Sequence, residues 1–337
     1  MELTSTHELA IEDRSGRGGT VRFVCTANPE GEILSFEEHD QYQGGPIRVP
    51  ADIEPQALLI ERVMARSHTD EQDLFRVSDF LLGITKRADS LRRYEGLVGS
   101  LVPKMRRSQT PVPGFITGLS GKDSILSFLI VYDAAVRMGL GERVLGIHYV
   151  SKRNRGSGWF EADAIPWLRE RCPEATILVE TPLGGNQDQQ RWADLHLRAL
   201  NTIETREDGE IVARSLPAGR NYWVVSGTNL TEHELGKYST MSRDASVAPI
   251  RTVWNGAALD MCIALGVPAS VIEHAQLPDC FCGRDEIAAA NIHLIDAILK
   301  HDFRVRDHDP DLLDQMIAYV RDLKRENGFK ARTPYML

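Results

Sequence analysis

Short apolar runs alternate with longer amphipathic segments through the middle of the chain. The short runs are β-prone and bounded by glycine, proline or polar turns, which is typical of strands. The longer segments place apolar residues at helical spacing, as from Ile125 to Met138. Strands separated by helices indicate an α/β fold with a doubly wound parallel sheet. The predicted strands are 115–119, 143–150, 175–180 and 221–226, and the later helices are 160–171 and 187–205.

The N-terminal region has a different pattern and predicts a separate appendage. Two β-prone stretches, 20–25 and 33–36, read as a hairpin with a turn between them. Amphipathic helical stretches follow at 54–67, 71–87 and 91–105. We therefore divide the chain into an N-terminal appendage at 1–85, a central domain at 86–300 and a C-terminal helical tail at 301–337.

The turn after the first predicted strand, residues 120–124, has the sequence Ser-Gly-Lys-Asp-Ser, which suits an anion-binding loop. Backbone N–H groups at the start of a helix, the positive end of the helix dipole and two serine hydroxyls converge there. Gly118 and Gly121 let phosphate oxygens approach the backbone, and Lys122 adds a positive charge.

Asp123 does not fit a site for phosphate alone, because a carboxylate repels a bare phosphate. Its presence therefore indicates a bridging Mg²⁺. The alternative is an ordinary strand-to-helix turn in which Asp123 caps the helix. We favour the anion site because glycine, lysine, carboxylate and serine coincide at the end of a predicted strand.

The fourth predicted strand runs into a second polar turn, at 226–240. Gly227 frees the turn, Thr228 places a hydroxyl near the strand end, and Glu232 falls in the first helical turn beyond. Ligands of doubly wound sheets bind beyond the carboxyl ends of strands, where both turns would lie. Glu232 would share the Mg²⁺ with Asp123, although a capping carboxylate would satisfy the same sequence.

The first turn resembles the Ser-Gly-Gly-x-Asp-Ser signature of the PP-loop ATP pyrophosphatases, and its register decides which hydroxyl contacts phosphate. The second turn resembles the Gly-Thr-x-Asn-Lys-Ser-Glu region of ammonia-dependent NAD synthetases, one residue short. Ala-Pro-Ile at 248–250 and Leu-Gly-Val-Pro at 265–268 resemble later motifs of that family. The resemblance covers residues 90–300 and implies an adenine nucleotide α-hydrolase-like, Rossmann-like domain.

The resemblance also implies the functional residues. Asp123 and Glu232 would bind Mg²⁺, and Lys122, Asp123 and Lys237 would act in catalysis. The residues that it assigns to ATP are Gly118, Ser120, Gly121, Lys122, Asp123, Ser124, His148, Arg198 and Thr228.

The chain departs from the family at two lysine positions. Asn255 stands where the family has a phosphate-binding lysine, and Leu230 replaces the lysine after the asparagine of the second turn. Lys122 or Lys237 is expected to compensate. With a lysine replaced and an additional N-terminal region, we do not expect the usual nicotinate dinucleotide substrate.

The implied activity is that of an ATP-dependent, AMP-forming ligase. A carboxylate or carbonyl oxygen of a small-molecule acceptor attacks the α-phosphorus, while Mg²⁺ and Lys122 neutralise the leaving pyrophosphate. Ammonia or an amine, taken from solution or a partner protein, then displaces AMP and forms an amide or C–N bond. The resemblance further implies a homodimer.

Composition limits the partners and the compartment. A net charge of −9 argues against a general nucleic-acid surface. No apolar run approaches membrane-spanning length and no signal peptide is recognisable, so we expect a cytoplasmic protein without a membrane partner. The 5 cysteines then indicate free thiols, and none of their spacings predicts a structural zinc site.

Two segments remain open to more than one interpretation. The basic loop 151–158 either covers a nucleotide or acidic substrate, or is simply solvated. Cys280 and Cys282 lie where NAD synthetases have a mobile loop. They are either incidental, or carry sulfur in a sulfur transferase that thiolates a nucleobase or small molecule. A non-catalytic nucleotide-binding protein is the alternative from a different class.

Replacing both thiols separates nitrogen from sulfur chemistry. For the nitrogen-transferring ligase, Cys280→Ser and Cys282→Ser should leave turnover unchanged, because neither thiol takes part. AMP release with each candidate acceptor is the measurement. Loss of product formation in either variant would instead support the sulfur transferase.

Overall fold

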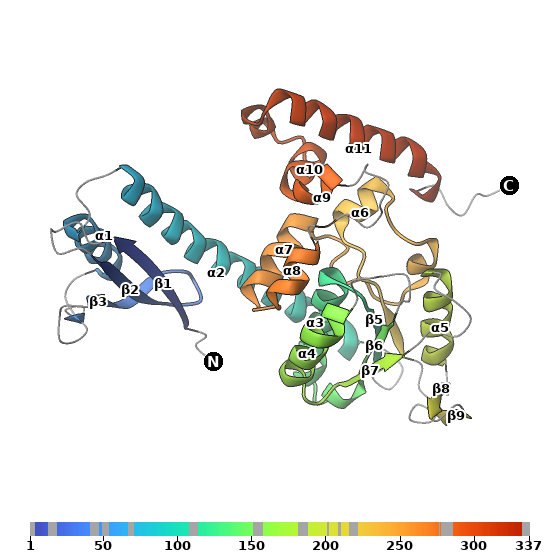
Figure 1. Ribbon diagram of the computed structural model, residues 1–337. Helices are drawn as coiled ribbons and strands as arrows, with labels where there is room; N and C mark the ends of the chain where they lie inside the picture. The colour runs from blue at the N-terminus through green and yellow to red at the C-terminus, as the bar shows by residue number, and fades with distance from the viewer. Residues whose placement is uncertain are drawn as a thin grey trace. The chain divides into compact units, whose positions relative to one another are not determined.

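The computed structural model describes residues 4–12, 19–40, 47–48, 54–66, 71–107, 114–150, 158–180, 188–200, 202–207, 210–215, 222–275, 277 and 286–331. The chain divides into two compact units, Met1–Tyr94 and Glu95–Leu337 (Figure 1). Helix α2 (Glu71–Arg106) crosses the division and is continuous through the two helical stretches predicted at 71–87 and 91–105.

The N-terminal unit is an antiparallel sheet covered by a helix. The strands pair in the order β1-β2-β3-β4, where the sequence predicted only a hairpin of the middle two. Alternate side chains of β2, from Val21 to Ala27, point into a core shared with Leu59 and Val63 of the helix. The elements are β1 (Ser5–Glu12), β2 (Thr20–Ala27), β3 (Ile33–Asp40), β4 (Ile47–Arg48) and α1 (Pro55–Arg66).

A buried ion pair joins the sheet to this helix. Glu38 of β3 is 1% exposed, and its Oε1 accepts hydrogen bonds from Nε of Arg66 at 2.9 Å and from Nη2 at 2.8 Å. A carboxylate withdrawn from water needs such a partner, since an unpaired buried charge is strongly destabilising. The last residue of α1 therefore holds the helix on the sheet.

The C-terminal unit contains the predicted parallel sheet. Its strands pair in the order β10-β5-β6-β7, all parallel. The chain runs outward from β5 to β7 and then returns to add β10 on the other side of β5. The winding therefore reverses between β5 and β10. The strands are β5 (Phe115–Leu119), β6 (Val144–Tyr149), β7 (Thr176–Glu180) and β10 (Trp223–Val225).

Helices cover both faces of this sheet, which confirms the doubly wound prediction. Helices α3 (Lys122–Val136) and α4 (Ile165–Arg171) lie on one face, and α5 (Asp188–Leu200) lies on the other (Figure 1). The helix predicted at 187–205 was too long. Strands β8 (Thr202–Glu207) and β9 (Glu210–Ser215) form a hairpin after it, because the β-branched run Thr-Ile-x-Thr favours a strand.

Two glycines allow the helices to pack closely on the sheet. A Cβ on Gly118 would lie 3.0 Å from Cδ1 of Leu195 on α5. A Cβ on Gly146 would lie 2.7 Å from Cδ1 of Leu119 and 3.0 Å from the ring of Phe128 on α3. Such distances are shorter than normal carbon contacts, so any larger residue would force the helices away.

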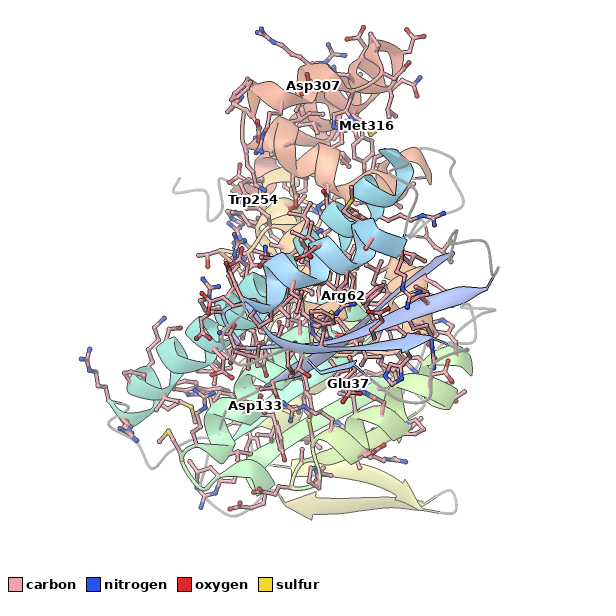
Figure 2. The ribbon with its side chains drawn as sticks, turned by 90° about the vertical axis from the view of Figure 1, so that its left-hand side faces the viewer. Glu37, Arg62, Asp133, Trp254, Asp307 and Met316 are labelled. Atoms are coloured by element: carbon pink, nitrogen blue, oxygen red, sulfur yellow. The ribbon has the colours of Figure 1, made fainter. Side chains whose placement is uncertain are left out.

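The remaining helices pack beyond the carboxyl ends of the strands. Helix α11, which forms most of the predicted C-terminal tail, packs on α6 and α10 (Figure 1). Leu235, Ile295 and Met316 belong to the cluster that joins these helices; Met316 is labelled in Figure 2. These helices are α6 (Leu230–Leu235), α7 (Asn255–Ala264), α8 (Ala269–Ala275), α9 (Glu286–Ala290), α10 (Ile292–Leu299) and α11 (Pro310–Ala331).

The described helices include none that combines the length and apolar character needed to cross a bilayer.

Replacing Arg66 tests the buried pair. Arg66→Met should lower the free energy of unfolding by about 1.5 to 3 kcal/mol, because it leaves the Glu38 carboxylate buried without its charged partner. Urea unfolding of the full chain measures this change in the free energy of unfolding. Arg22→Met is the matched control, because its pair with Glu8, at 3.6 Å, has side chains 55% and 50% exposed. Equal losses of unfolding free energy in Arg66→Met and Arg22→Met would contradict a special role for the buried pair.

Candidate functional site

A cavity of about 440 Å³ lies where the winding of the sheet reverses. It is lined by the loop after β5, by the loop after β10, and by residues of α5, α6, α8 and α11. Parallel sheets bind ligands at this position, because the loops that leave two neighbouring strands in opposite directions open a crevice between them. The two turns singled out in the sequence therefore meet at one site.

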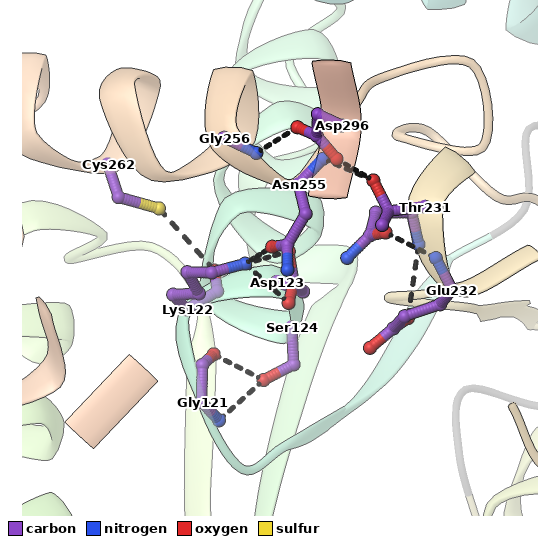
Figure 3. Close-up of polar contacts among 11 residues, drawn as sticks. Gly121, Lys122, Asp123, Ser124, Thr231, Glu232, Asn255, Gly256, Cys262 and Asp296 are labelled. Carbon is purple, nitrogen blue, oxygen red and sulfur yellow. Dashed lines mark hydrogen bonds and ion pairs between the residues drawn. The ribbon is translucent and has the colours of Figure 1, made fainter. Parts of the chain in front are cut away.

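The Ser124 hydroxyl closes the loop after β5. Its Oγ accepts a hydrogen bond from the backbone N–H of Gly121 at 3.0 Å and donates to the Gly121 carbonyl at 2.7 Å (Figure 3). The same Oγ also accepts from the backbone N–H of Ser120 at 2.9 Å. Apart from Gly121 itself and its two chain neighbours, no described residue has an atom within 4 Å of the point that a Cβ on Gly121 would occupy. The loop is thus shaped by its own serine, with open space in front of the glycine.

Gly227 brings the second loop against the first. A Cβ there would lie 3.1 Å from the Ser124 nitrogen and 3.3 Å from the Asp123 carbonyl carbon. Those are backbone atoms of the first turn of α3, which cannot move aside cheaply. The glycine is therefore required for the close contact between the two loops.

Lys122 is the central charge of the site. The residue is 5% exposed, and its Nζ lies 2.7 Å from both carboxylate oxygens of Asp123. The same ammonium donates to the side-chain oxygen of Asn255, at the start of α7 (Figure 3). Burial alone would lower the pKa of Lys122, but the Asp123 carboxylate outweighs burial and raises it. The ammonium therefore stays charged.

Asn255 therefore contacts Lys122, one of the two lysines expected to compensate for the missing phosphate-binding lysine. The sequence resemblance placed Asn255 where the NAD synthetase family has a phosphate-binding lysine. In this fold the Lys122 ammonium, from the loop on the opposite side, reaches that asparagine. The site accordingly keeps one positive charge at this point, supplied by α3 in place of α7.

Glu232 acts as a capping carboxylate and also lines the cavity. Its Oε2 accepts from the Asn229 backbone nitrogen at 3.3 Å, and its own nitrogen donates to Oδ1 of Asn229 at 2.9 Å. This reciprocal pair is a capping box at the start of α6. Asp123 lines the same cavity, so the two carboxylates predicted to bind Mg²⁺ share one site. Their metal role stays a prediction.

Thr228 and Lys237 also line the cavity. Thr228 is buried, and its Oγ1 accepts from the Ser226 hydroxyl at 3.0 Å. The Nζ of Lys237 donates to the Tyr319 hydroxyl of α11 at 3.2 Å. The helical tail therefore contributes a side chain to the site, which the division at residue 300 did not anticipate.

Arg198 was predicted to face the nucleotide, but it does not line the cavity. Its Nε donates to Asp194 at 2.7 Å and its Nη1 donates to Glu180 at 3.0 Å. Burial opposes the charge, but these two carboxylates outweigh burial and raise the pKa of Arg198. Its guanidinium ties α5 to the end of β7, which is a structural role.

His148 also lies outside the cavity lining. Its Nδ1 is 2.9 Å from the Leu119 carbonyl, and its ring stacks on Phe160 with 4.4 Å between centroids. The imidazole is 5% exposed and belongs to β6, which pairs with a strand on either side. Successive residues of a strand point to opposite faces of the sheet, and only one of the two faces carries the ligand site. The strand pattern alone does not say which face that is.

Arg191 is a cavity residue that the sequence analysis missed. It lies seven residues before Arg198 on α5, so two helical turns place both on one face, with Arg191 at the cavity end. Its Nε is buried and has no hydrogen-bond partner among the described residues. Trp192, next to it, also lines the cavity. An orphaned guanidinium nitrogen in a cavity wall suits an anionic or hydrogen-bond-accepting ligand.

An aromatic pair forms another part of the wall. Trp159 and His274 line the cavity and stack with 4.0 Å between ring centroids and 15° between planes. Trp159 follows the basic segment 151–157, which lies outside the described residues. Flat side chains of this kind suit contact with a planar ring.

A buried carboxylate on α10 holds these elements together, and the sequence analysis also missed it. Asp296 is 2% exposed, and its oxygens accept from the Thr231 hydroxyl and, at 2.7 Å, from the Gly256 nitrogen (Figure 3). Thr231 Oγ1 in turn accepts from the Asn255 nitrogen at 2.9 Å. Asp296 therefore fixes the start of α7, and with it the asparagine that receives Lys122.

The sulfur-carrying candidates Cys280 and Cys282 lie outside the described residues. The described cysteines are Cys25, Cys172 and Cys262, all buried. Burial raises the pKa of each to about 12, so none is a reactive thiolate at neutral pH. Buried thiols of this kind pack as small apolar side chains.

Replacing Asp296 tests the network. Asp296→Asn should lower the free energy of unfolding by about 1 to 3 kcal/mol. The amide nitrogen of asparagine would face a hydrogen-bond donor, either the Thr231 hydroxyl or the Gly256 nitrogen. Burial raises the pKa of Asp296 above its ordinary 3.8, so the folded state binds a proton that the unfolded chain releases. Its stabilising contribution is then present at low pH and falls as pH rises through the raised pKa.

The deficit of the Asp296→Asn variant should therefore be larger at pH 4 than at pH 7 in urea unfolding. Asp314→Asn, at an exposed position of α11 beyond its first turn, is the control and should change neither value. A deficit that does not depend on pH would contradict the raised pKa.

The comparisons with known proteins rest on structure. No model of a protein family matches the chain, and no curated protein matches its sequence. The chain is similar to the NMN synthetase from Francisella tularensis, at 16% identity and a TM-score of 0.53, over 74% of this chain and 98% of that one.

Two further solved structures are similar at lower scores. The NH3-dependent NAD synthetase from Campylobacter jejuni matches at 16% identity and a TM-score of 0.48, over 74% of this chain and 99% of that one. The NAD+ synthetase from Burkholderia pseudomallei matches at 12% identity and a TM-score of 0.44, over 71% and 90%. The likeness to the NMN synthetase shows a shared fold, and together with the strand order it confirms the doubly wound, Rossmann-like α/β domain that the sequence predicted.

Proposed function

We propose that the chain binds ATP in the cavity where the sheet winding reverses, and transfers AMP to a small-molecule acceptor with release of pyrophosphate. Ammonia or an amine then displaces AMP to form an amide or C–N bond. The observation that carries the proposal is the buried Lys122 ammonium, placed at the N-terminus of α3 by Asp123 and Asn255.

The loop after β5 is suited to hold the β- and γ-phosphates. The first N–H groups of α3 have no acceptor within the helix, and the helix dipole adds positive potential there. Gly121 leaves space for phosphate oxygens in front of the loop. Lys122 supplies the charge that neutralises the leaving pyrophosphate, which is the principal electrostatic requirement of phosphoryl and adenylyl transfer.

Asp123 and Glu232 are the residues that would hold Mg²⁺ together with phosphate oxygens. Both line the cavity, and carboxylate oxygens are the ligands that this ion prefers. A bound Mg²⁺ would supply charge neutralisation of the phosphates. Because both Asp123 oxygens lie 2.7 Å from Nζ of Lys122, the lysine orients this carboxylate for such a role.

The remaining cavity residues suit the nucleotide and the acceptor. Arg191, with its orphaned Nε, is placed to contact ATP phosphate or the acceptor. The Trp159–His274 pair offers a flat surface to the adenine ring. Lys237 is held at the opposite wall by Tyr319 and is placed to bind the acceptor anion. The fold shared with an NMN synthetase supports ligase chemistry in preference to simple nucleotide binding.

Product analysis tests the proposal. The full chain with ATP, Mg²⁺, ammonia and a panel of carboxylate acceptors should release AMP and pyrophosphate in equal amounts, and only when an acceptor is present. Lys122→Met should lower kcat by about 100-fold or more, because a preorganised charge is lost from the transition state. Lys104→Met, at an exposed position of α2, is the control and should retain full activity.

Two outcomes would contradict the proposal. Release of ADP and phosphate would indicate a different bond cleavage. ATP binding without any acceptor-dependent AMP release would indicate a nucleotide-binding protein without this activity.

A further inference from the structure

The peptide unit between Leu119 and Ser120 is the point where the chain leaves the sheet and enters the loop after β5. Leu119 is the last residue of β5 in register with β6, where it lies opposite His148. The pairing of β5 with β10 ends earlier, at Thr117. The sheet by itself therefore does not fix the direction in which the backbone groups of this peptide unit point.

Both ends of this peptide unit are held by side chains. The Leu119 carbonyl lies 2.9 Å from Nδ1 of His148, and the Ser120 N–H donates to Oγ of Ser124 at 2.9 Å. Because a carbonyl oxygen can only accept, Nδ1 carries a proton and donates it. A peptide unit is planar and turns as one body, so the two hydrogen bonds together fix its orientation.

That orientation bears on anion binding, because Leu119 and Ser120 both line the cavity. If the peptide unit turned over, the Ser120 N–H would leave Ser124, and the Leu119 carbonyl would leave His148. The negative end of the carbonyl dipole would then be free to face a bound anion, which it would repel. The His148 hydrogen bond keeps this carbonyl directed at the imidazole.

The ring of His148 is held from its other side by the segment that carries Trp159. The imidazole stacks on Phe160 with 4.4 Å between centroids and 17° between planes. Phe160 packs edge-on against Trp159, with 5.3 Å between centroids, and Trp159 stacks on His274 in the cavity wall. One imidazole therefore contacts the loop through its N–H and supports the aromatic wall through its ring face.

These two contacts differ in kind and can be removed separately. Within the described residues, the bond to Leu119 is the one hydrogen bond of the imidazole, since Nε2 is buried without a partner. Oε1 of Glu161 lies 3.7 Å from Nε2, which is longer than a hydrogen bond. A replacement that keeps the donor and loses the ring, or the reverse, therefore isolates one contact.

We propose that His148 is a positioning residue for both walls of the cavity. Its N–H fixes the peptide unit before the loop that receives the phosphates, and its ring face fixes Phe160 and, through Phe160, Trp159 beside the adenine. The assignment of the walls to phosphates and adenine rests on the proposed function. His148 does not line the cavity, so its effect on ATP is indirect, in place of the direct contact that the sequence resemblance implied.

Three replacements of His148 separate the two contacts. In His148→Asn the amide nitrogen stands as many bonds from Cβ as Nδ1 does, so it can donate to the Leu119 carbonyl, but the ring is lost. His148→Phe keeps a ring against Phe160 and has no N–H. In His148→Gln the amide nitrogen lies further along the side chain, in place of Nε2, so neither contact is kept.

Calorimetric titration of the full chain with two probes measures the effect. Pyrophosphate with Mg²⁺ reports on the loop, and adenosine reports on the aromatic wall. His148→Phe should weaken pyrophosphate binding about 10-fold, because the carbonyl loses its donor, and leave adenosine binding within about 2-fold. His148→Asn should leave pyrophosphate binding within about 2-fold and weaken adenosine binding about 5-fold, because the stacking is lost. His148→Gln should weaken both.

A histidine elsewhere serves as the control. His308→Phe, at an exposed position before α11, should change neither affinity. Urea unfolding of each variant shows whether weaker binding reflects loss of folding. Should His148→Phe fail to fold, the Asn and Gln variants repeat the loop comparison with the same amide group, and equal pyrophosphate binding in those two would overturn the assignment.

A histidine that only stabilised the fold would give a different result. Equal weakening of both probes in His148→Phe and His148→Asn, or no weakening in either, would overturn the positioning role while leaving the proposed function standing. Failure of the proposed function would appear separately, as the absence of probe binding and of AMP release in the unmodified chain.

Discussion

The contact between the Lys122 ammonium, the Asp123 carboxylate and the Asn255 amide is the interaction on which the site depends. A lysine that is 5% exposed can remain charged only if its surroundings compensate for lost hydration. Asp123 provides the opposite charge and Asn255 provides a further acceptor. The result is a fixed positive charge at the start of α3, in the position where a polyphosphate would need one.

That contact in turn relies on elements far apart in the sequence. Asn255 is oriented by Thr231, and Thr231 by Asp296, so α6, α7 and α10 all act on a residue of the loop after β5. Gly227 lets the second loop approach the backbone of Ser124. The hydrophobic contacts of α10 and α11 hold these polar groups away from water, which strengthens each hydrogen bond.

The C-terminal helices therefore belong to the site as much as the sheet does. Helix α11 supplies Tyr319 to the cavity and fastens the loop after α6 through Lys330. Two positive regions result, one on α3 and one around Tyr238. The second region consists of Arg243, Arg251 and Lys330, whose cationic groups lie 5.5 to 5.9 Å from the centroid of the Tyr238 ring.

The sequence by itself determined the parallel sheet, its two polar turns and the glycine, lysine and carboxylate of the first, because strand and helix periodicity and turn chemistry are local properties. It gave the wrong length for α5 and missed β1. It also selected Arg198, whereas Arg191 of the same helix lines the cavity, since periodicity places both on one face without saying where along the helix the ligand lies. The contact of Lys122 with Asn255, and the support of Asp296, were decided by tertiary structure alone, because residues 133 and 40 positions apart meet only when the chain has folded.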